Sequence, residues 1–425
     1  MMKNLILKRT IFCAATLIAL IFALYFASLC LMRNETYDRY QTFKKSKTDY
    51  DVLFFGTSHV LNAVAPMQLW EEHGITSYNL SWHSTSIISN YWLLQVAEKY
   101  HKPKIAVIDI LGINNLSKTP ALGYFHGAFD EFPLSLTKIK ATNDLFEDKP
   151  SHRTEVLFSF YSYHNRWKEN SSIKNFVKSG AKRFFGIYKP STTKGMDLRV
   201  GVKTEETFDM SVNEYEGKES VAIEYAKKII DYCHKNDIIP VFMFVPYSEQ
   251  ENLFEWRDAF KKILEEEKVA FLDMTSGIVD FDIDQYDQNS HMNPSGARKV
   301  TAEIGNFLSE KYALKSHKEE PYFKSWNDDY EQYVKYLQEV IKNQYKLENL
   351  LMLMNNSEVY AKVEVKNSVE LNPTERKLIF ENTSEIIFER NDTLESDIKV
   401  SVFSKKDDSL VCEKNFVTAR VMQKL

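Results

Sequence analysis

The spacing of apolar positions predicts an α/β domain in the middle of the chain. Five short apolar runs, typical of buried strands, are separated by segments in which apolar residues recur at helical spacing. Such an alternation predicts a parallel sheet covered by helices on both faces. The predicted strands are residues 51–55, 78–80, 105–111, 238–245 and 269–272.

Two regions depart from this pattern. Residues 115–215 are polar and are punctuated by prolines, which predicts a long irregular insertion. Residues 330–354 have the period of one long amphipathic helix, and residues 359–365 alternate apolar and polar side chains as a half-buried strand does. Further strands are expected at 376–380, 386–389 and 398–403. The end of the chain therefore predicts a small α+β domain with an antiparallel sheet.

The N-terminus carries a different signal. Residues 10–32 form a run of 23 uncharged, mostly apolar residues, and about 20 suffice to cross a bilayer. Lys3, Lys8 and Arg9 precede the run and only Arg33 follows it directly, which favours a cytoplasmic N-terminus. The alternative is a cleaved signal peptide, but residues 27–32 fit a small-x-small cleavage site poorly. We expect an uncleaved anchor at residues 1–33, with the domains at 34–318 and 319–425 outside the cytoplasm.

Composition and charge narrow the functional classes. The chain has 425 residues, 44% hydrophobic and 27% charged, as expected for a folded globular protein. Its net charge of -5 argues against nucleic acid as a partner, since phosphate binding needs clustered lysine and arginine. Two of the four cysteines lie in the anchor, and no Cys-x-x-Cys or Cys/His cluster indicates zinc. We expect neither a metal nor an organic cofactor.

One candidate for chemistry follows the first predicted strand of the α/β domain. The sequence Phe-Phe-Gly-Thr-Ser-His at residues 54–59 places Ser58 just beyond the strand end, where ligands of open α/β sheets bind. A serine there is exposed and can be approached by a base. The alternative is a helix-capping serine in an ordinary turn, and a motif this short does not decide between them.

A second candidate lies before the last helix of the same domain. His291 stands in a loop between the last predicted strand and a helix that Asn293 and Pro294 are suited to begin. Histidine is the natural base for a serine hydroxyl, and a nearby carboxylate orients it. The alternative is a surface-loop histidine without a special role.

Together the two stretches resemble the SGNH/GDSL hydrolase superfamily. Gly56-Thr57-Ser58 is similar to its first block and the His291 segment to its last, which implies Ser58 as nucleophile and His291 as base. The segment 111–115 resembles the Gly-x-Asn-Asp block, which implies an oxyanion hole formed by Asn114 and the backbone N–H of Ser58. More narrowly, the chain resembles the membrane-anchored branch that includes the D-alanylation protein DltD and the alginate acetylation proteins.

The chain also departs from the superfamily pattern. The triad aspartate usually lies three residues before the histidine, where this chain has Gln288. Asp287 lies four residues before and becomes the expected acid if one loop residue bulges out, with Asp284 and Asp282 as alternatives. The second-block glycine is missing near residues 81–84, and Asn115 replaces the usual aspartate of the third block.

Four other residues are candidates for substrate binding. His164, Arg166 and Trp167 in the insertion mix aromatic and polar groups, as a carbohydrate cleft does, although a packed helix face is the alternative. His59 follows the nucleophile and either lines the site or packs behind it. Aspartates at 280, 282 and 284 are spaced as in a calcium loop, but Gln285 stands where that loop needs glycine, so calcium is not expected.

These features and the resemblance predict an SGNH-type serine enzyme anchored in a membrane, with an SGNH-like (flavodoxin-like) fold. It would transfer or remove an acyl group, in the first place O-acetyl, on a cell-envelope polysaccharide. The resemblance further implies a multi-pass membrane-bound O-acyltransferase as partner. A plain carbohydrate esterase with water as acceptor is the alternative among enzymes. A catalytically silent protein that holds polymer for such a partner is the alternative from another class.

Overall fold

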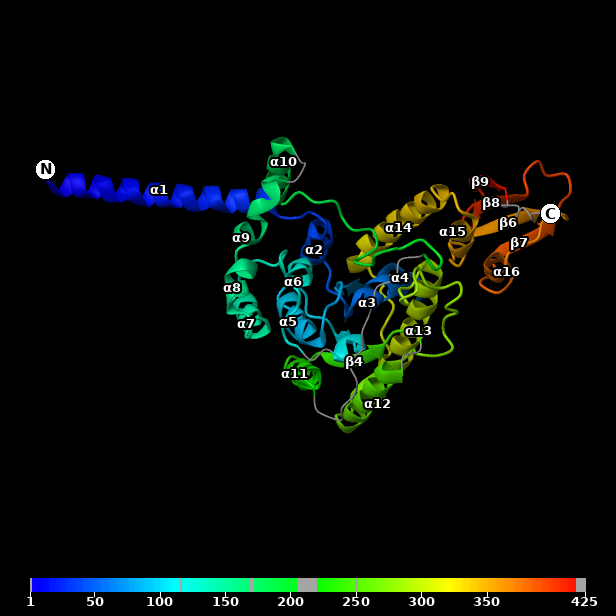
Figure 1. Ribbon diagram of the computed structural model, residues 1–425, viewed down its shortest axis with the longest axis horizontal. Coiled ribbons are helices and arrows are strands. Elements are labelled where there is room, and N and C mark those ends of the chain that lie inside the picture. The colour runs from blue at the N-terminus through cyan, green and yellow to red at the C-terminus, as the bar shows by residue number, and fades with distance from the viewer. Residues whose placement is uncertain (1, 115–116, 169–171, 205–219, 249–250, 418–425) are drawn as a thin grey trace, which may run out of the picture. The chain divides into compact units, whose positions relative to one another are not determined.

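The computed structural model describes residues 2–114, 117–168, 172–204, 220–248 and 251–417 (Figure 1). The chain divides into two compact units, each described by itself. Unit 1 comprises residues 1–46, 92–100 and 117–191, and unit 2 comprises residues 47–91, 101–116 and 192–425. Helix α5 (Ile87–Ala97) crosses the boundary between them.

Unit 2 contains the predicted parallel sheet. Its strands follow the order β2-β1-β3-β4-β5, and every pair of neighbours is parallel. This confirms the α/β class and the five strands expected from the apolar runs. The strands are β1 (Val52–Phe55), β2 (Ser77–Asn79), β3 (Ile105–Asp109), β4 (Ile239–Phe244) and β5 (Ala270–Asp273).

Helices cover both faces of this sheet, which explains why its strands are apolar throughout. On one face, Val52, Phe54 and Val107 pack with side chains of α3 (Ser58–Ala63), α4 (Pro66–His73) and α13 (Pro294–Tyr312). On the other, the ring of Phe242 lies 5.3 Å from that of Phe260 in α12 (Glu251–Glu266). Helix α11 (Val221–Lys235) contacts β4.

The start of α13 matters because it fixes the end of the His291 loop. Asn293 Oδ1 accepts hydrogen bonds from the backbone N–H groups of Ser295 (3.0 Å) and Gly296 (3.2 Å), and Pro294 is the first helical residue. The expected asparagine cap and proline start are therefore confirmed.

A second sheet in unit 2 has its own apolar core. Its order is β7-β6-β8-β9, with β6–β8 and β8–β9 antiparallel and β6–β7 parallel, so the expected antiparallel sheet is instead mixed. The expected alternation at 359–365 is confirmed, because every second residue there is buried. The strands are β6 (Val359–Val365), β7 (Ile386–Arg390), β8 (Ile398–Ser404) and β9 (Leu410–Phe416).

Two expectations for this region were wrong. Residues 376–380 belong to helix α16 (Pro373–Phe380) rather than to a strand, because Asn372 and Glu375 form a reciprocal capping box that starts a helix. A helix there also provides the crossover that the parallel pair β6–β7 requires. The expected single helix at 330–354 is two, α14 (Lys324–Lys342) and α15 (Leu347–Met352), and the break allows the leucines of α15 to enter the core of the second sheet.

Unit 1 is mostly helical among its described residues. The expectation of an irregular insertion at 115–215 was wrong for residues 122–184, which are largely helical, whereas residues 185–204 are irregular as expected. Its prolines do not interrupt helices: Pro150 is the first residue of α8, and Pro120, Pro133 and Pro190 lie between helices. The elements are α1 (Met2–Leu31), α2 (Tyr37–Lys44), α6 (Leu122–Phe129), α7 (Leu136–Leu145), α8 (Pro150–Leu157), α9 (Ser159–Tyr163), η2 (His164–Lys168) and α10 (Ile173–Phe184). By length and composition, α1 could cross a membrane with residues 6–31.

Candidate active site

The turn between β1 and α3 presents Ser58 at the carboxyl edge of the parallel sheet. Thr57 caps α3 by accepting a hydrogen bond from the backbone N–H of His59 (3.3 Å). Gly56 is required here, since a Cβ at this position would lie 2.6 Å from Val60 Cγ2 and 2.8 Å from Asp109 Cβ. The turn is therefore tight, and Ser58 remains partly exposed among buried neighbours.

Three of the sequence-selected side chains form a continuous hydrogen-bonded chain. Ser58 Oγ lies 2.8 Å from His291 Nε2, and His291 Nδ1 lies 2.8 Å from Asp287 Oδ2. A carboxylate on Nδ1 holds the proton there, which leaves Nε2 free to accept the serine proton. The arrangement has the geometry of a nucleophile, its base and the acid that orients the base.

A bulge in the loop brings Asp287 within reach of His291 despite the extra residue between them. Ser290 has a φ of +64°, in the left-handed region that a non-glycine residue rarely adopts. Its hydroxyl accepts a hydrogen bond from the backbone N–H of Ser248 (2.9 Å) and lies 3.0 Å from the Ser248 hydroxyl. The backbone N–H of Asn289 donates to Asp287 Oδ1 (2.9 Å). These contacts hold the loop in the form that points both side chains inward.

Asp287 is buried and kept ionised by its surroundings. Burial by itself would raise the pKa of this carboxyl, but the hydrogen bond and charge of His291 and the backbone N–H groups of Asn289 and His291 outweigh it, so that the pKa is lowered. An ionised acid is what the imidazolium form of His291 needs beside it.

The two alternative acids are engaged elsewhere. Asp284 accepts hydrogen bonds from the Ser295 hydroxyl (2.8 Å) and the Lys299 ammonium (2.6 Å). Asp282 pairs with Lys203 and Lys377, whose hydrogen bonds lower its pKa to about 2. Lys377 also binds Asp280 (2.8 Å), so that this acidic stretch is neutralised by lysine. Among the described residues, no group of three or more His, Cys, Asp and Glu side chains could hold a metal ion.

His59 lies behind the candidate base rather than in an open cleft. Its ring stacks on that of His291, with centroids 4.2 Å apart and planes at 18°, and its side chain is only 1% exposed. Nε2 lies 2.7 Å from the carbonyl oxygen of Asn289, which can only accept, so Nε2 carries the proton. Burial, reinforced by His291, lowers the pKa of His59 to about 3, which keeps the ring neutral. Packing behind the site, one of the two roles considered above, fits this geometry.

The oxyanion donors are only partly described. Ser58 is the first residue of α3, so its backbone N–H has no partner within that helix. The backbone of Asn114 ends the short helix η1 (Leu111–Asn114) after β3, but its side chain and the whole of Asn115 lie outside the described residues. At the position of the missing glycine, the backbone N–H of Ser81 donates to Asn79 Oδ1 (3.1 Å).

His164, Arg166 and Trp167 belong to unit 1, whereas the Ser58 chain belongs to unit 2. His164 Nδ1 lies 2.6 Å from the carbonyl oxygen of Tyr161, and Arg166 donates to the carbonyl oxygen of Leu31 at the end of α1. The Trp167 side chain lies outside the described residues. These contacts of His164 and Arg166 lie within unit 1, and a role of these residues in substrate binding stays a prediction.

Sequence reasoning overlooked two parts of the site. Ser248 follows β4, and its contact with Ser290 supports the His291 loop. Asp109 ends β3 beside the Gly56 turn, and burial raises its pKa to about 7, partly offset by the backbone N–H groups of Leu111 and Val245. Both residues follow or end a strand at the carboxyl edge of the sheet, and that position was the available signal.

Comparison with known proteins gives neighbours of the GDSL/SGNH class. A protein assigned to the G-D-S-L lipolytic family from Desulfitobacterium hafniense DCB-2 is similar at 11% identity over 60% of this chain and 98% of that chain, with a TM-score of 0.32. A GDSL-like lipase from Bacteroides thetaiotaomicron VPI-5482 is similar at 9% identity over 65% and 98%, with a TM-score of 0.31.

An acetyl xylan esterase from the rumen bacterium Butyrivibrio proteoclasticus is similar at 10% identity over 63% of this chain and 66% of that chain, with a TM-score of 0.28. No family model and no curated protein matches the chain. At these identities and TM-scores the neighbours carry no argument about activity, so any function must be argued from the geometry around Ser58.

Proposed function

We propose that this chain is an SGNH-type serine enzyme that acts on ester bonds through an acyl-enzyme on Ser58. The observation that carries the proposal is the hydrogen-bonded chain from Ser58 Oγ to His291 Nε2 and from His291 Nδ1 to Asp287 Oδ2, each step 2.8 Å. Three buried or half-buried polar groups in this order, at the carboxyl edge of a parallel sheet, have no evident structural purpose.

The reaction follows from the positions of these groups. His291 takes the proton of Ser58 as the serine oxygen attacks the ester carbonyl, and Asp287 stabilises the imidazolium that forms. His291 then returns that proton to the departing alcohol, which leaves an acyl group on Ser58. The backbone N–H of Ser58 and the Asn114 side chain are the proposed donors to the oxyanion, each worth about 3–4 kcal/mol in such sites.

The acceptor of the acyl group is a sugar hydroxyl or water. We propose an O-acyl group, in the first place O-acetyl, on a cell-envelope polysaccharide, with helix α1 as a membrane anchor and the rest of the chain outside the cytoplasm. The apolar length of α1 and the lysine and arginine residues before it support this location. A multi-pass membrane-bound O-acyltransferase is the proposed source of the acyl group, on the family resemblance alone.

The nucleophile is tested with the full chain in detergent. A fluorophosphonate probe should label wild type, and the label should disappear in Ser58→Ala and fall steeply in His291→Ala. Labelling of the Asp287→Asn variant should fall as well. Labelling of the Asp284→Asn variant should not, because Asp284 faces Ser295 and Lys299. Labelling that persists in Ser58→Ala would exclude Ser58 as the nucleophile.

The reaction product distinguishes transfer of the acyl group to a sugar from its hydrolysis by water. The purified chain is given an acetyl donor such as p-nitrophenyl acetate, with and without an oligosaccharide acceptor. Acetylated oligosaccharide indicates transfer, and acetate alone indicates a carbohydrate esterase that uses water. Equal polymer acetylation in cells that carry wild type or Ser58→Ala would instead favour a silent polymer-binding protein.

A further inference from the structure

The strongest feature outside the Ser58 site is the surface of unit 1 beside α1. Helix α10 packs along the end of α1: the Phe184 ring meets Phe22 and Phe26 edge-on, with centroids 5.7 and 6.1 Å away. One turn earlier, Gly180 lies so close to Cys30 that a Cβ there would be 2.3 Å from the Cys30 Sγ. Figure 1 shows α10 next to the same end of α1.

These contacts determine the depth of α10. Phe22 and Phe26 lie nine and five residues before Leu31, or roughly 14 and 8 Å along the helix axis. Both belong to the apolar segment 6–31 that is long enough to cross a bilayer. A side chain packed on them must lie at their depth, so if α1 crosses a membrane, the Phe184 end of α10 is in the membrane too.

The sequence of α10 suits that position. At 100° per residue, one face carries an apolar stripe and the next face a lysine stripe. The apolar stripe is Ile173, Val177, Gly180 and Phe184, and the lysine stripe is Lys174, Lys178 and Lys182. In the apolar stripe, Ile173 is 81% and Val177 48% exposed. Both side chains are of types that are usually buried in a protein core.

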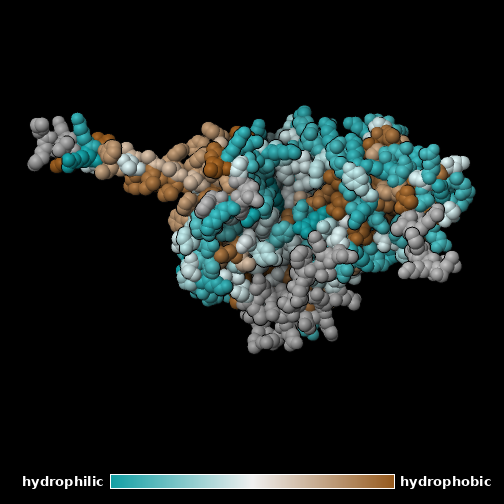
Figure 2. Space-filling view, turned by 45° about the horizontal axis from the view of Figure 1, so that its top comes forward, coloured by the Kyte–Doolittle hydropathy of each residue, from teal (hydrophilic) through white to brown (hydrophobic). Residues whose placement is uncertain are grey.

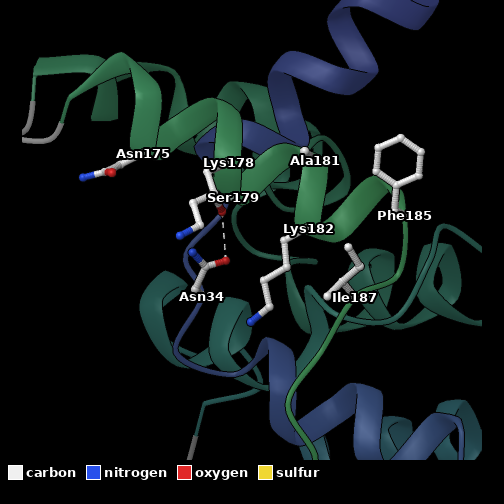
Figure 3. A pocket seen from close by; sticks show the side chains of 8 residues that line it. All are labelled: Asn34, Asn175, Lys178, Ser179, Ala181, Lys182, Phe185 and Ile187. Atoms are coloured by element: carbon white, nitrogen blue, oxygen red, sulfur yellow. Dashed lines mark hydrogen bonds between the residues drawn. The ribbon is translucent and has the colours of Figure 1, made fainter.

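The same surface continues beyond the helix. Phe185 and Ile187, just after α10, are 71% and 60% exposed. They line a hollow of about 500 Å³ together with Lys178, Lys182 and Asn34 (Figure 3). Lys182 already pairs with Asp38 (2.8 Å), so Lys178 is the lysine of this hollow that an anionic lipid headgroup would meet beside the apolar side chains. Figure 2 shows apolar side chains covering α1 and continuing onto the surface where α1 joins the rest of the chain.

We propose that α10 is a second membrane contact: an amphipathic helix lying in the leaflet where α1 leaves the bilayer. Ile173 and Val177, the part of the apolar stripe that does not pack on α1, contact acyl chains, and Lys174 and Lys178 reach the headgroups, as in interfacial helices. A protein partner would suit the stripe less well, because lysine is depleted from the buried centres of protein interfaces. The proposal rests on α1 crossing the membrane and is independent of the chemistry at Ser58.

The test measures the depth of single nitroxide labels on the full chain in phosphatidylcholine–phosphatidylglycerol nanodiscs. Cys30 and Cys412 are replaced by serine, and Cys233 is kept because it is buried. Labels are placed in turn at Cys13 (α1), Val177→Cys (apolar stripe) and Lys140→Cys, a matched exposed position on α7; Cys13 becomes serine in the last two. Ile187→Cys, also with Cys13 replaced by serine, is a second probe of the surface, and the circular dichroism spectrum of each variant reports folding.

For each nitroxide label, the rate of collision with oxygen, which dissolves in acyl chains, is compared with the rate of collision with a water-soluble nickel chelate. The ratio of oxygen to nickel collisions at 177 and 187 should be several-fold above that at 140 and close to that at 13. A ratio at 177 equal to that at 140 would show the stripe in water and overturn the proposal. Exclusion of both reagents from 177 would show a protein covering it, and a water-like ratio at 13 would show that α1 does not cross; either result also overturns it.

Discussion

His59 illustrates how a residue next to the nucleophile can act without touching substrate. Its ring stacks on His291, and its Nε2–H donates to the Asn289 carbonyl oxygen in the loop that carries Asp287 and His291. It therefore supports the candidate base from behind, through one packing contact and one hydrogen bond.

Two substitutions separate these contributions. His59→Phe keeps a ring on His291 but removes the hydrogen bond to the Asn289 carbonyl, at a cost of about 1–3 kcal/mol, whereas His59→Gln keeps a donor and loses the ring. We expect His59→Phe to lower kcat for p-nitrophenyl acetate by roughly tenfold or more, since small misplacements of a base are costly. His59→Gln should remain closer to wild type, and KM should change little in both. A change mainly in KM would instead indicate that His59 contacts substrate.

Asp109 predicts a pH dependence of stability. Its pKa in the folded chain is about 7, against about 4 in the unfolded chain. Because the folded pKa is raised, the contribution of this group to stability is fully present below about pH 4 and is lost as pH rises through 7. Asp109→Asn cannot ionise and should lose less stability between pH 5 and 8, by up to about 3 kcal/mol.

The measurement is the urea midpoint of unit 2 within the full chain at both pH values, with Asp231→Asn, an exposed position of the same unit, as the matched control. A wild-type protein and an Asp109→Asn variant that respond equally to pH would show that Asp109 is ionised in the folded chain.

The turn between β1 and α3 is the element on which the site depends. Gly56→Ala would place a methyl group against Val60 and Asp109, and such overpacking costs about 1–3 kcal/mol. We expect a folded protein whose Ser58 is displaced from His291 and no longer reacts with a fluorophosphonate. Gly123→Ala on α6 is the matched control, because a Cβ there meets nothing within 4 Å. Equal labelling of the two variants would show that the turn tolerates the methyl group.

The His291 loop shows what pattern reading can and cannot predict about an element. The residues before α13 were recognisable because the cap Asn293 and Pro294 are local signals. The sequence favoured Asp287 as the acid, with Asp284 and Asp282 as alternatives, but spacing along a loop does not determine which carboxylate points towards His291. The left-handed Ser290 and its contacts with Ser248, 42 residues away, turn Asp287 inward.

At the scale of the whole molecule, the charges that flank the apolar run predict how the chain is oriented across the membrane. With Lys3, Lys8 and Arg9 before the apolar run, the N-terminus should be cytoplasmic and residues 34–425 external. In a bacterial host, trypsin added to spheroplasts should digest the external part and leave a membrane-embedded fragment that contains α1. A cytoplasmic marker enzyme is the control for intact spheroplasts. Protection of the full chain until lysis would reverse the orientation.

The chain's own pattern was sufficient for the class of fold, and together with the family resemblance it selected Ser58 and His291 as the residues to test first. Some signals depend only on neighbours in sequence and could be read directly: the strand and helix periods, the helix caps and the long apolar run. The five strands predicted for the parallel sheet are confirmed. The same reading missed α16 and the helices of the insertion, whose type depends on capping contacts and packing.

Tertiary structure was needed wherever two distant segments meet. Ser58 and His291 are 233 residues apart, and only the strand order brings them within 2.8 Å. Likewise, the sequence of α10 shows only a basic amphipathic helix. Its depth along α1 follows from the contacts of Phe184 with Phe22 and Phe26. Local sequence determines what each segment can be, while long-range packing determines which side chains act together, since that choice depends on the free energy of the whole fold.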